Sequence, residues 1–195
     1  MEEFQKKTEK TVIHKINVDN LDITYVTNGE VPGYLLNQFF MDEYKGNFRI
    51  ATTTGDSWWG RTSSLNHMYV LNQDLETIGS VDDLAKGERI YSTRFMGDRA
   101  YMVTFRQVDP LFVIDLSNPE SPKVLGQLKV TGFSSYLHPY DENHIIGIGK
   151  EASEDGRVQG LKIALFDVSD VSNPIEQAKY EVKEQLSDSN ALYDH

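Results

Sequence analysis

The chain has 195 residues, of which 39% are hydrophobic, and its 30 acidic against 19 basic residues leave a net charge of −11. This charge repels phosphate backbones and offers no counterion release, so we expect no nucleic-acid partner. The lack of cysteine excludes disulfides, thiolate metal sites and cysteine nucleophiles. We also expect no membrane span, because no apolar run has the necessary length, and the first seven residues lack the apolar stretch of a signal peptide.

The order of the elements predicts an all-β protein. Residues 1–10 are polar and without period, so we expect a disordered lead-in, with order beginning near Thr11. From there, short β-branched and aromatic runs alternate with Gly, Asp, Asn and Pro turns, and no helical pattern lasts three turns. The expected strands are 12–18, 23–27, 34–40, 48–54, 67–72, 77–81, 90–95, 100–105, 111–115, 123–130, 134–138, 144–149, 161–168 and 175–182.

A motif of an apolar residue followed by Asp or Asn recurs near the end of four of these strands, and in all but the first a second apolar residue precedes it. Its last residues are Asn17, Asn72, Asp115 and Asp167. The period is therefore roughly 40 to 55 residues. A second marker, a turn followed by an apolar strand, recurs in step with the first at 46–51, 97–103 and 142–147. The two markers together indicate an internal repeat.

Four strands in a repeat of this length are typical of a β-propeller blade, a small twisted sheet that buries its faces against its neighbours. The sequence therefore predicts about three and a half four-stranded antiparallel blades within residues 11–186, with a β-sandwich as the alternative fold. The predicted parts are a half-blade at 12–27, blades at 34–81, 90–130 and 134–182, and a polar tail at 187–195. Because the half-blade lacks its inner strands, we expect an incomplete propeller cut from a larger one.

Four stretches of the chain carry a resemblance to a known family. They are Val31–Gln38, Gly87–Phe105, Asp109–Leu116 and Gly132–Asp141. They are similar to an uncharacterised family of secreted bacterial and archaeal beta-propeller domains, distantly related to WD40 repeats, and the resemblance covers residues 11–195. It implies an extracellular or cell-surface location and a parent protein several times longer than this chain. It implies no catalytic or cofactor residue, because the family has none established.

The segment 52–64 is the candidate binding site. It is a polar loop between two expected strands that carries both tryptophans of the protein, Trp58 and Trp59, beside Asp56 and Arg61. Adjacent indole rings can stack on sugars, hold a peptide or receive a cation, while Arg61 and Asp56 add directional hydrogen bonds. The alternative is that the loop folds back and one Trp covers its own blade.

Other candidate sites have simpler explanations. Asp115 and Asp167, with the Ser and Asn-Pro that follow each, can offer oxygen ligands to Ca²⁺, but the same pattern suits a tight turn. The five histidines show no ligand spacing, so we predict no metal site. Ser57 lacks a nucleophile motif, and the acidic pairs at 42–43 and 82–83 are expected in solvated turns. No cofactor is predicted.

Three hypotheses for function remain at this point. The first is a non-catalytic binding or scaffolding propeller that recognises an unidentified protein or glycan ligand through its loops. The second is an enzyme, a glycan hydrolase or lyase, with its site in the central funnel of a complete propeller. The third is a structural section whose open edges, such as 12–18, present unpaired backbone groups and associate with copies of the chain.

Overall fold

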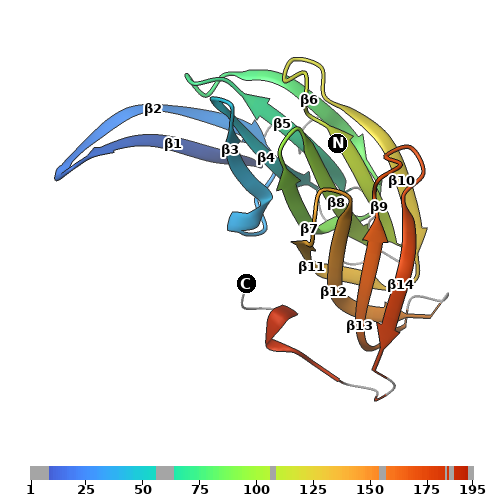
Figure 1. The fold of residues 1–195 in the computed structure, drawn as a ribbon. Helices are drawn as coiled ribbons and strands as arrows, with labels where there is room; N and C mark the ends of the chain where they lie inside the picture. The colour runs from blue at the N-terminus through green and yellow to red at the C-terminus, as the bar shows by residue number, and fades with distance from the viewer. Residues whose placement is uncertain are drawn as a thin grey trace. The chain divides into compact units, whose positions relative to one another are not determined.

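The computed structural model of the chain describes residues 9–55, 64–105, 109–153, 157–182, 184 and 187–192. Their strands form one two-stranded sheet and three four-stranded sheets, with antiparallel pairing throughout (Figure 1). The predicted all-β class, with three and a half blades, is confirmed. The chain divides into two compact units, residues 1–87 with 118–122, and residues 88–117 with 123–195.

The first unit contains a long hairpin and one four-stranded sheet. The hairpin strands are β1 (Lys10–Asp19) and β2 (Asp22–Pro32). The sheet strands, in spatial order, are β3 (Met41–Tyr44), β4 (Asn47–Thr54), β5 (Leu65–Leu71) and β6 (Thr77–Leu84). Positive φ angles at Lys45 and Gly46 give the β3–β4 turn the twist that a two-residue hairpin loop requires.

The second unit contains two four-stranded sheets. The first has β7 (Arg89–Met96), β8 (Arg99–Phe105), β9 (Asp109–Asp115) and β10 (Lys123–Val130). The second has β11 (Phe133–Pro139), β12 (His144–Ala152), β13 (Val158–Asp167) and β14 (Ile175–Glu181). Strands that follow one another in the chain are neighbours in each sheet, so both are simple meanders.

The two sheets of the second unit pack face to face. Their shared core consists of residues that are at most 2% exposed: Tyr101, Val103, Leu111, Val113, Leu137, Ile145, Ala164, Phe166 and Val168. Side chains alternate between the two faces of a strand, so Tyr101 and Val103 of β8 project on the same side. Burial of a side chain of this size contributes about 1.5–3 kcal/mol, which makes the interface the main stabilising feature of this unit.

The expected strand at 34–40 is wrong. Tyr34 makes only an isolated bridge to Thr53, and the chain then forms a 3₁₀ turn at Gln38–Phe40 before β3 begins at Met41. The cause is Asn37, whose side-chain oxygen accepts the Phe39 N–H at 2.9 Å. An asparagine that bonds its own backbone in this way favours a turn over a strand.

Both ends of the described chain are more ordered than the sequence suggests. Strand β1 begins at Lys10, within the expected lead-in, and Lys10 forms an ion pair with Glu30. In the expected polar tail, Ser187 Oγ accepts the Leu161 N–H at 2.7 Å, and a 3₁₀ turn at Asn190–Leu192 leaves Leu192 only 8% exposed. The tail therefore packs on its own unit through one apolar residue.

A glycine on β10 lets a turn approach the sheet closely. An added Cβ at Gly126 would lie 2.3 Å from the carbonyl oxygen of Val171, in the turn before β14. Gly79 on β6 stands in the same relation to the carbonyl of Pro119, at 2.2 Å. Gly126 lies opposite Val113, and the corresponding position on β14, opposite Leu165, is Ala178.

We predict that Gly126→Ala destabilises the protein by about 1–3 kcal/mol, as overpacking does. An unconstrained Gly→Ala change would instead stabilise by about 0.4–1 kcal/mol. The free energy of unfolding in urea distinguishes these signs. The control Ala178→Gly is expected to cost only about 0.5–1 kcal/mol, and a stabilised Gly126→Ala variant would contradict the packing described here.

Candidate functional site

The residues selected from the sequence, Asp56, Trp58, Trp59 and Arg61, lie outside the described residues. They belong to segment 56–63, which leaves β4 after Gly55 and returns to β5 through Ser64. The described residues on either side of it form the base of this loop. The contacts among these flanking residues show how firmly the two ends of the segment are held.

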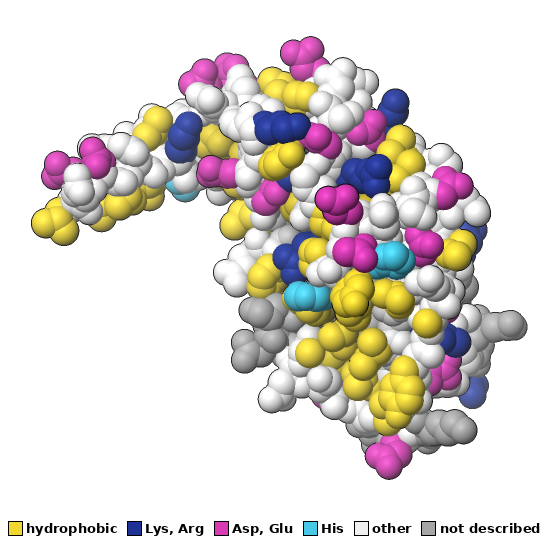
Figure 2. All heavy atoms as spheres, viewed as in Figure 1, with side chains coloured by type: hydrophobic (Ala, Val, Ile, Leu, Met, Phe, Trp, Pro, Cys, Tyr) yellow, Lys and Arg dark blue, Asp and Glu magenta, His cyan; other side chains and the backbone are white. Residues whose placement is uncertain are grey.

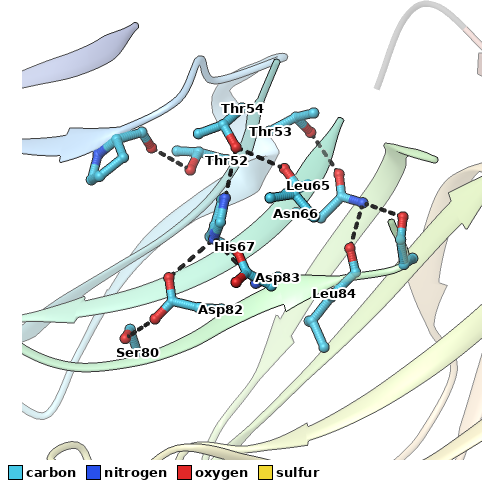
Figure 3. A network of polar contacts seen from close by, with 12 residues as sticks. Thr52, Thr53, Thr54, Leu65, Asn66, His67, Ser80, Asp82, Asp83 and Leu84 are labelled. Carbon is cyan, nitrogen blue, oxygen red and sulfur yellow. Dashed lines mark hydrogen bonds and ion pairs between the residues drawn. The ribbon is translucent and has the colours of Figure 1, made fainter. Parts of the chain in front are cut away.

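The base of the loop is a buried polar network between β4 and β5 (Figure 3). Thr53 Oγ1 donates to the side-chain oxygen of Asn66 at 2.8 Å, and the Asn66 amide donates to the Leu84 carbonyl at 3.1 Å. Thr53 is 3% exposed and Asn66 is 0% exposed. Buried polar groups whose hydrogen bonds are satisfied favour a single arrangement of the strands that carry them. The network thus holds the two strands that lead into the loop.

His67 extends the network to β6. Its ring is fully buried; Nε2 lies 2.9 Å from Thr54 Oγ1, and Nδ1 lies 3.0 Å from Asp82 Oδ1. The second oxygen of Asp82 accepts the Ser80 hydroxyl at 2.5 Å. A chain of hydrogen bonds therefore joins β4, β5 and β6, and in Figure 3 the His67 ring lies between Thr54 and Asp82.

The contacts of His67 assign its protonation. Nδ1 faces both the Asp82 carboxylate and the backbone N–H of Asp83, which is 3.3 Å away. A carboxylate only accepts, so the shorter contact, with Asp82, assigns the proton to Nδ1; in that tautomer Nδ1 cannot also accept the Asp83 N–H, and the 3.3 Å contact is not a hydrogen bond. Nε2 then accepts the Thr54 hydroxyl, and the longer contact of that hydroxyl with the Leu65 carbonyl, at 3.5 Å, is secondary.

The connectivity hydroxyl–imidazole–carboxylate is also that of a nucleophilic triad. A triad must present its hydroxyl to a substrate, however, and Thr54 is 2% exposed while His67 is 0% exposed. This arrangement is therefore structural. Sequence patterns did not reveal it, because the contact depends on strand register, including the irregularity between Asn66 and Met68.

The two acidic pairs that the sequence assigned to solvated turns lie in strands. Asp82 and Asp83 belong to β6, and Asp42 belongs to β3. Asp42 pairs with the guanidinium of Arg49, a residue only 2% exposed, and the Nε–Oδ1 distance is 2.7 Å. Asp42 and Asp82 each contact a buried partner, but the side chains of Asp82 and Asp83 remain 44% and 55% exposed, so these two carboxylates are solvated as expected although they lie in a strand.

The hydrogen-bond network lowers the pKa of the Asp82 carboxyl. Partial burial acts to raise the pKa of its carboxyl, but the hydrogen bonds from Ser80 and His67 outweigh burial and hold the pKa below its ordinary value. Burial also raises the pKa of Tyr69, whose hydroxyl contacts the same carboxylate. Asp82 therefore stays ionised in the folded protein at a pH where the unfolded chain already binds a proton.

We predict that Asp82→Asn lowers stability at pH 7 by about 0.5–1.5 kcal/mol, the net value of a hydrogen bond, and flattens the loss of stability in acid. A carboxyl whose pKa is lowered on folding stabilises above its unfolded pKa, near 3.8, and that contribution disappears as the pH falls through the folded pKa. Urea unfolding at pH 7 and pH 3 measures both effects. The matched control is Asp83→Asn, which keeps a residue that tolerates the positive φ found there. Equal pH dependence in both variants and the wild type would contradict the assignment.

The turns predicted around Asp115 and Asp167 are present. Asp115 accepts the Ser117 N–H at 3.0 Å and Asp167 accepts the Ser169 N–H at 2.9 Å. The hydrogen bonds from Ser117 also hold the pKa of Asp115 below its ordinary value. Among the described residues, no cluster of three His, Asp or Glu side chains is arranged to hold a metal ion.

Two hollows lie at the strand turns, one in each unit. The first, about 430 Å³, is lined by β1 and by the β3–β4 and β5–β6 turns, with His14, Glu43 and Asn72 among its polar groups. The second, about 700 Å³, lies between the β7–β8 and β11–β12 turns and is acidic, with Asp98 and Asp141. The antiparallel order places the first hollow at the end of its sheet opposite segment 56–63. Neither hollow was predicted from the sequence.

A buried ion cluster in the second unit was also not predicted. Lys162 on β13 is 4% exposed, and its Nζ lies 2.7 Å from Glu176 Oε1 and 3.6 Å from Glu151 Oε2. Neither oxygen is hydrogen-bonded within the described part of the chain, so these contacts are ion pairs. Nζ also donates to the Thr131 carbonyl at 2.8 Å, which fastens the β10–β11 connection to β13. The two glutamates and the carbonyl oxygen together offset the cost of burying the Lys162 ammonium group.

Comparison with known proteins identifies the family. The family model described as the beta propeller domain matches residues 1–195, and the chain belongs to this family. The chain is 52% identical over 182 residues to an uncharacterised protein of Methanocaldococcus jannaschii, covering 93% of this chain and 28% of that protein. It is 44% identical over 189 residues to an uncharacterised protein of Archaeoglobus fulgidus, covering 96% of this chain and 28% of that protein. The chain thus spans just over a quarter of the length of these relatives.

The described residues contain no helix with the length and apolar character needed to cross a membrane.

Proposed function

We propose that the chain is part of a non-catalytic binding or scaffolding propeller of an exported or cell-surface protein, and that segment 56–63 makes the ligand contacts. Membership of the beta propeller family suggests a binding or scaffolding role. Binding residues are often carried by loops that a rigid scaffold positions. The extracellular or cell-surface location rests on the resemblance to secreted propellers.

The observation that carries this proposal is the buried network at the base of the loop. Thr53 with Asn66, and Thr54 with His67, join β4 to β5 immediately before and after segment 56–63. The Gly55 N–H also donates to the Glu9 carboxylate at 3.1 Å. Fixed ends reduce the conformational entropy that a loop loses when it binds a ligand.

The composition of the segment suggests the class of ligand. Trp58 and Trp59 offer large flat apolar surfaces, while Arg61 and Asp56 offer directional hydrogen bonds. This combination suits a sugar ring or an extended peptide, so the proposed ligand is a glycan or a protein segment. A nucleic acid is not proposed, because the chain carries a net charge of −11.

The experiment uses the fact that the chain has only two tryptophans, both in this segment, so that its tryptophan fluorescence reports on the loop alone. We predict that a ligand found on a glycan array or in a peptide library changes this emission. Trp58→Ala and Trp59→Ala should each weaken binding about 10-fold or more, as loss of an aromatic hot spot does. The control Tyr140→Ala removes an aromatic side chain, 69% exposed, from a turn of the second unit.

Equal affinity of the Trp variants and the wild type, or binding without a change in emission, would contradict the loop assignment. Turnover of a glycan by the longer relatives would favour the alternative function, a glycan hydrolase or lyase with its site in the funnel of a complete propeller.

A further inference from the structure

The hollow of the second unit lies between two turns that are held in the same way. The β7–β8 turn is fastened to the end of β9, because the Asp98 carbonyl accepts the Leu116 N–H at 2.8 Å. The β11–β12 turn is fastened to the end of β13, because the Asn143 carbonyl accepts the Val168 N–H at 2.8 Å. All the residues that line the hollow belong to this one unit. Its walls are therefore formed in advance, as those of most small-molecule sites are.

Tyr101 forms the floor of this hollow. The residue is 1% exposed and belongs to the core between the two sheets, yet it lines the hollow. A buried tyrosine hydroxyl usually has a hydrogen-bond partner. The Tyr101 hydroxyl has none within the described part of the chain. It is also not among the unpartnered side-chain atoms of the described residues that are sealed from solvent, so the hydroxyl is the part of Tyr101 that a ligand can reach.

The rim of the hollow is acidic. It carries the carboxylates of Asp98, Asp141 and Glu142 against a single guanidinium, that of Arg99. Arg99 lies opposite Asp115 on β9, and its charge acts on that carboxylate, so part of the positive charge is already offset. Figure 2 shows acidic side chains next to a histidine on the surface of the second unit. The rim therefore favours a positively charged ligand.

Asp141 is the carboxylate of the rim whose orientation is fixed. Its Oδ1 accepts the Asn143 N–H at 2.8 Å and lies 2.9 Å from His144 Nδ1. The hydrogen bonds from the Asn143 backbone and from His144 hold the pKa of Asp141 below its ordinary value, so the group is ionised at neutral pH. A carboxylate has about four acceptor positions, which leaves some for a ligand.

The remaining lining residues are aromatic or apolar. Tyr140 is 69% exposed, and its backbone is fixed because its N–H donates to the His144 carbonyl at 3.0 Å. Met96 and Pro139 complete the wall. An aromatic ring attracts a cation to its face, and apolar walls suit the methylene stem that carries one.

The size and chemistry of the hollow favour an organic cation over a metal ion. Among the described residues, no three His, Asp or Glu side chains converge closely enough to hold a metal ion. The volume of about 700 Å³ instead lies within the range of sites for small organic molecules. An ammonium group donates three hydrogen bonds, so it can use acceptors that are too far apart for a metal ion.

We propose that this hollow binds an aliphatic ammonium group, as a polyamine or a lysine side chain carries it. The Tyr101 hydroxyl accepts one N–H at the floor, Asp141 and Glu142 supply the opposite charge, and Met96 and Pro139 contact the stem. This site is independent of segment 56–63, because none of its residues belongs to that segment.

The experiment measures the binding of two probes to the intact chain by isothermal titration calorimetry at low ionic strength. The probes are spermidine and the peptide Gly-Lys-Gly with both ends blocked. We expect Tyr101→Phe to weaken binding about 10-fold, as loss of a hydrogen bond to a charged group does. The same change should leave the midpoint of thermal unfolding unaltered, because the hydroxyl has no partner within the described part of the chain.

A second variant and two controls separate the site from general attraction to an acidic protein. Glu142→Gln lies in an exposed turn, so it should fold normally and weaken binding about threefold, the effect of a solvent-exposed ion pair. The control Glu120→Gln removes the same charge from an exposed turn outside the hollow. The control Tyr180→Phe removes a hydroxyl from a residue that is 67% exposed and also outside the hollow. Both controls should bind as the wild type does.

Unchanged affinity in Tyr101→Phe, or equal weakening by Glu142→Gln and Glu120→Gln, would show that the probes respond only to the net charge of −11 and would overturn the proposal. Failure of both probes to bind would overturn it too. Where the Tyr101 hydroxyl is required, tighter binding of spermidine would identify a free polyamine as the ligand. Tighter binding of the peptide would instead identify a lysine of a protein segment.

Discussion

The sheets of this protein are stabilised chiefly by burial of their apolar faces, and an antiparallel sheet can leave one of its two faces in water. Sheet β7–β10 has both faces covered, since Ala100 and Met102 on one side of β8 and Tyr101 and Val103 on the other are all at most 2% exposed. In the β1–β2 hairpin, Ile13 packs on the core of the first unit, while Ile16 and its cross-strand partner Tyr25 remain more than half exposed. The number of covered faces therefore differs from sheet to sheet. We therefore expect the local free energy of opening to differ among the sheets in the same order.

The polar features of the structure follow from this packing. Close approach of neighbouring elements requires glycine where a turn meets a strand, as at Gly79 and Gly126. It also leaves a few polar groups buried, and two of them are compensated by partners within their own units. His67 is held by Thr54 and Asp82, and Lys162 by two glutamates. Both groups are buried, so each stabilises the unit that contains it.

The regular parts of the fold could be predicted from sequence, whereas the contacts inside it could not. Alternation and turn residues located the central strands, because Val113-Ile114-Asp115 and Leu165-Phe166-Asp167 end equivalent strands. The strand expected at 34–40 failed at Asn37, where a local side-chain hydrogen bond favours a turn over an extended strand. The Thr54–His67–Asp82 contact depends on the register of three strands, and periodicity alone does not determine a register that contains bulges. The predicted ligand residues, Trp58 among them, lie outside the described part, and their role remains a prediction.

Amide hydrogen exchange on the intact chain tests most directly the claim that sheet stability follows the number of covered faces. Exchange requires opening of the hydrogen-bonded strand, and its rate reports the local free energy of opening. The account predicts slowest exchange in β8 and β9, faster exchange in β12 and β13, whose outer face is open, and fastest exchange in the outer part of the β1–β2 hairpin. Equal protection of the hairpin around Ile16 and of β9 around Val113 would contradict it.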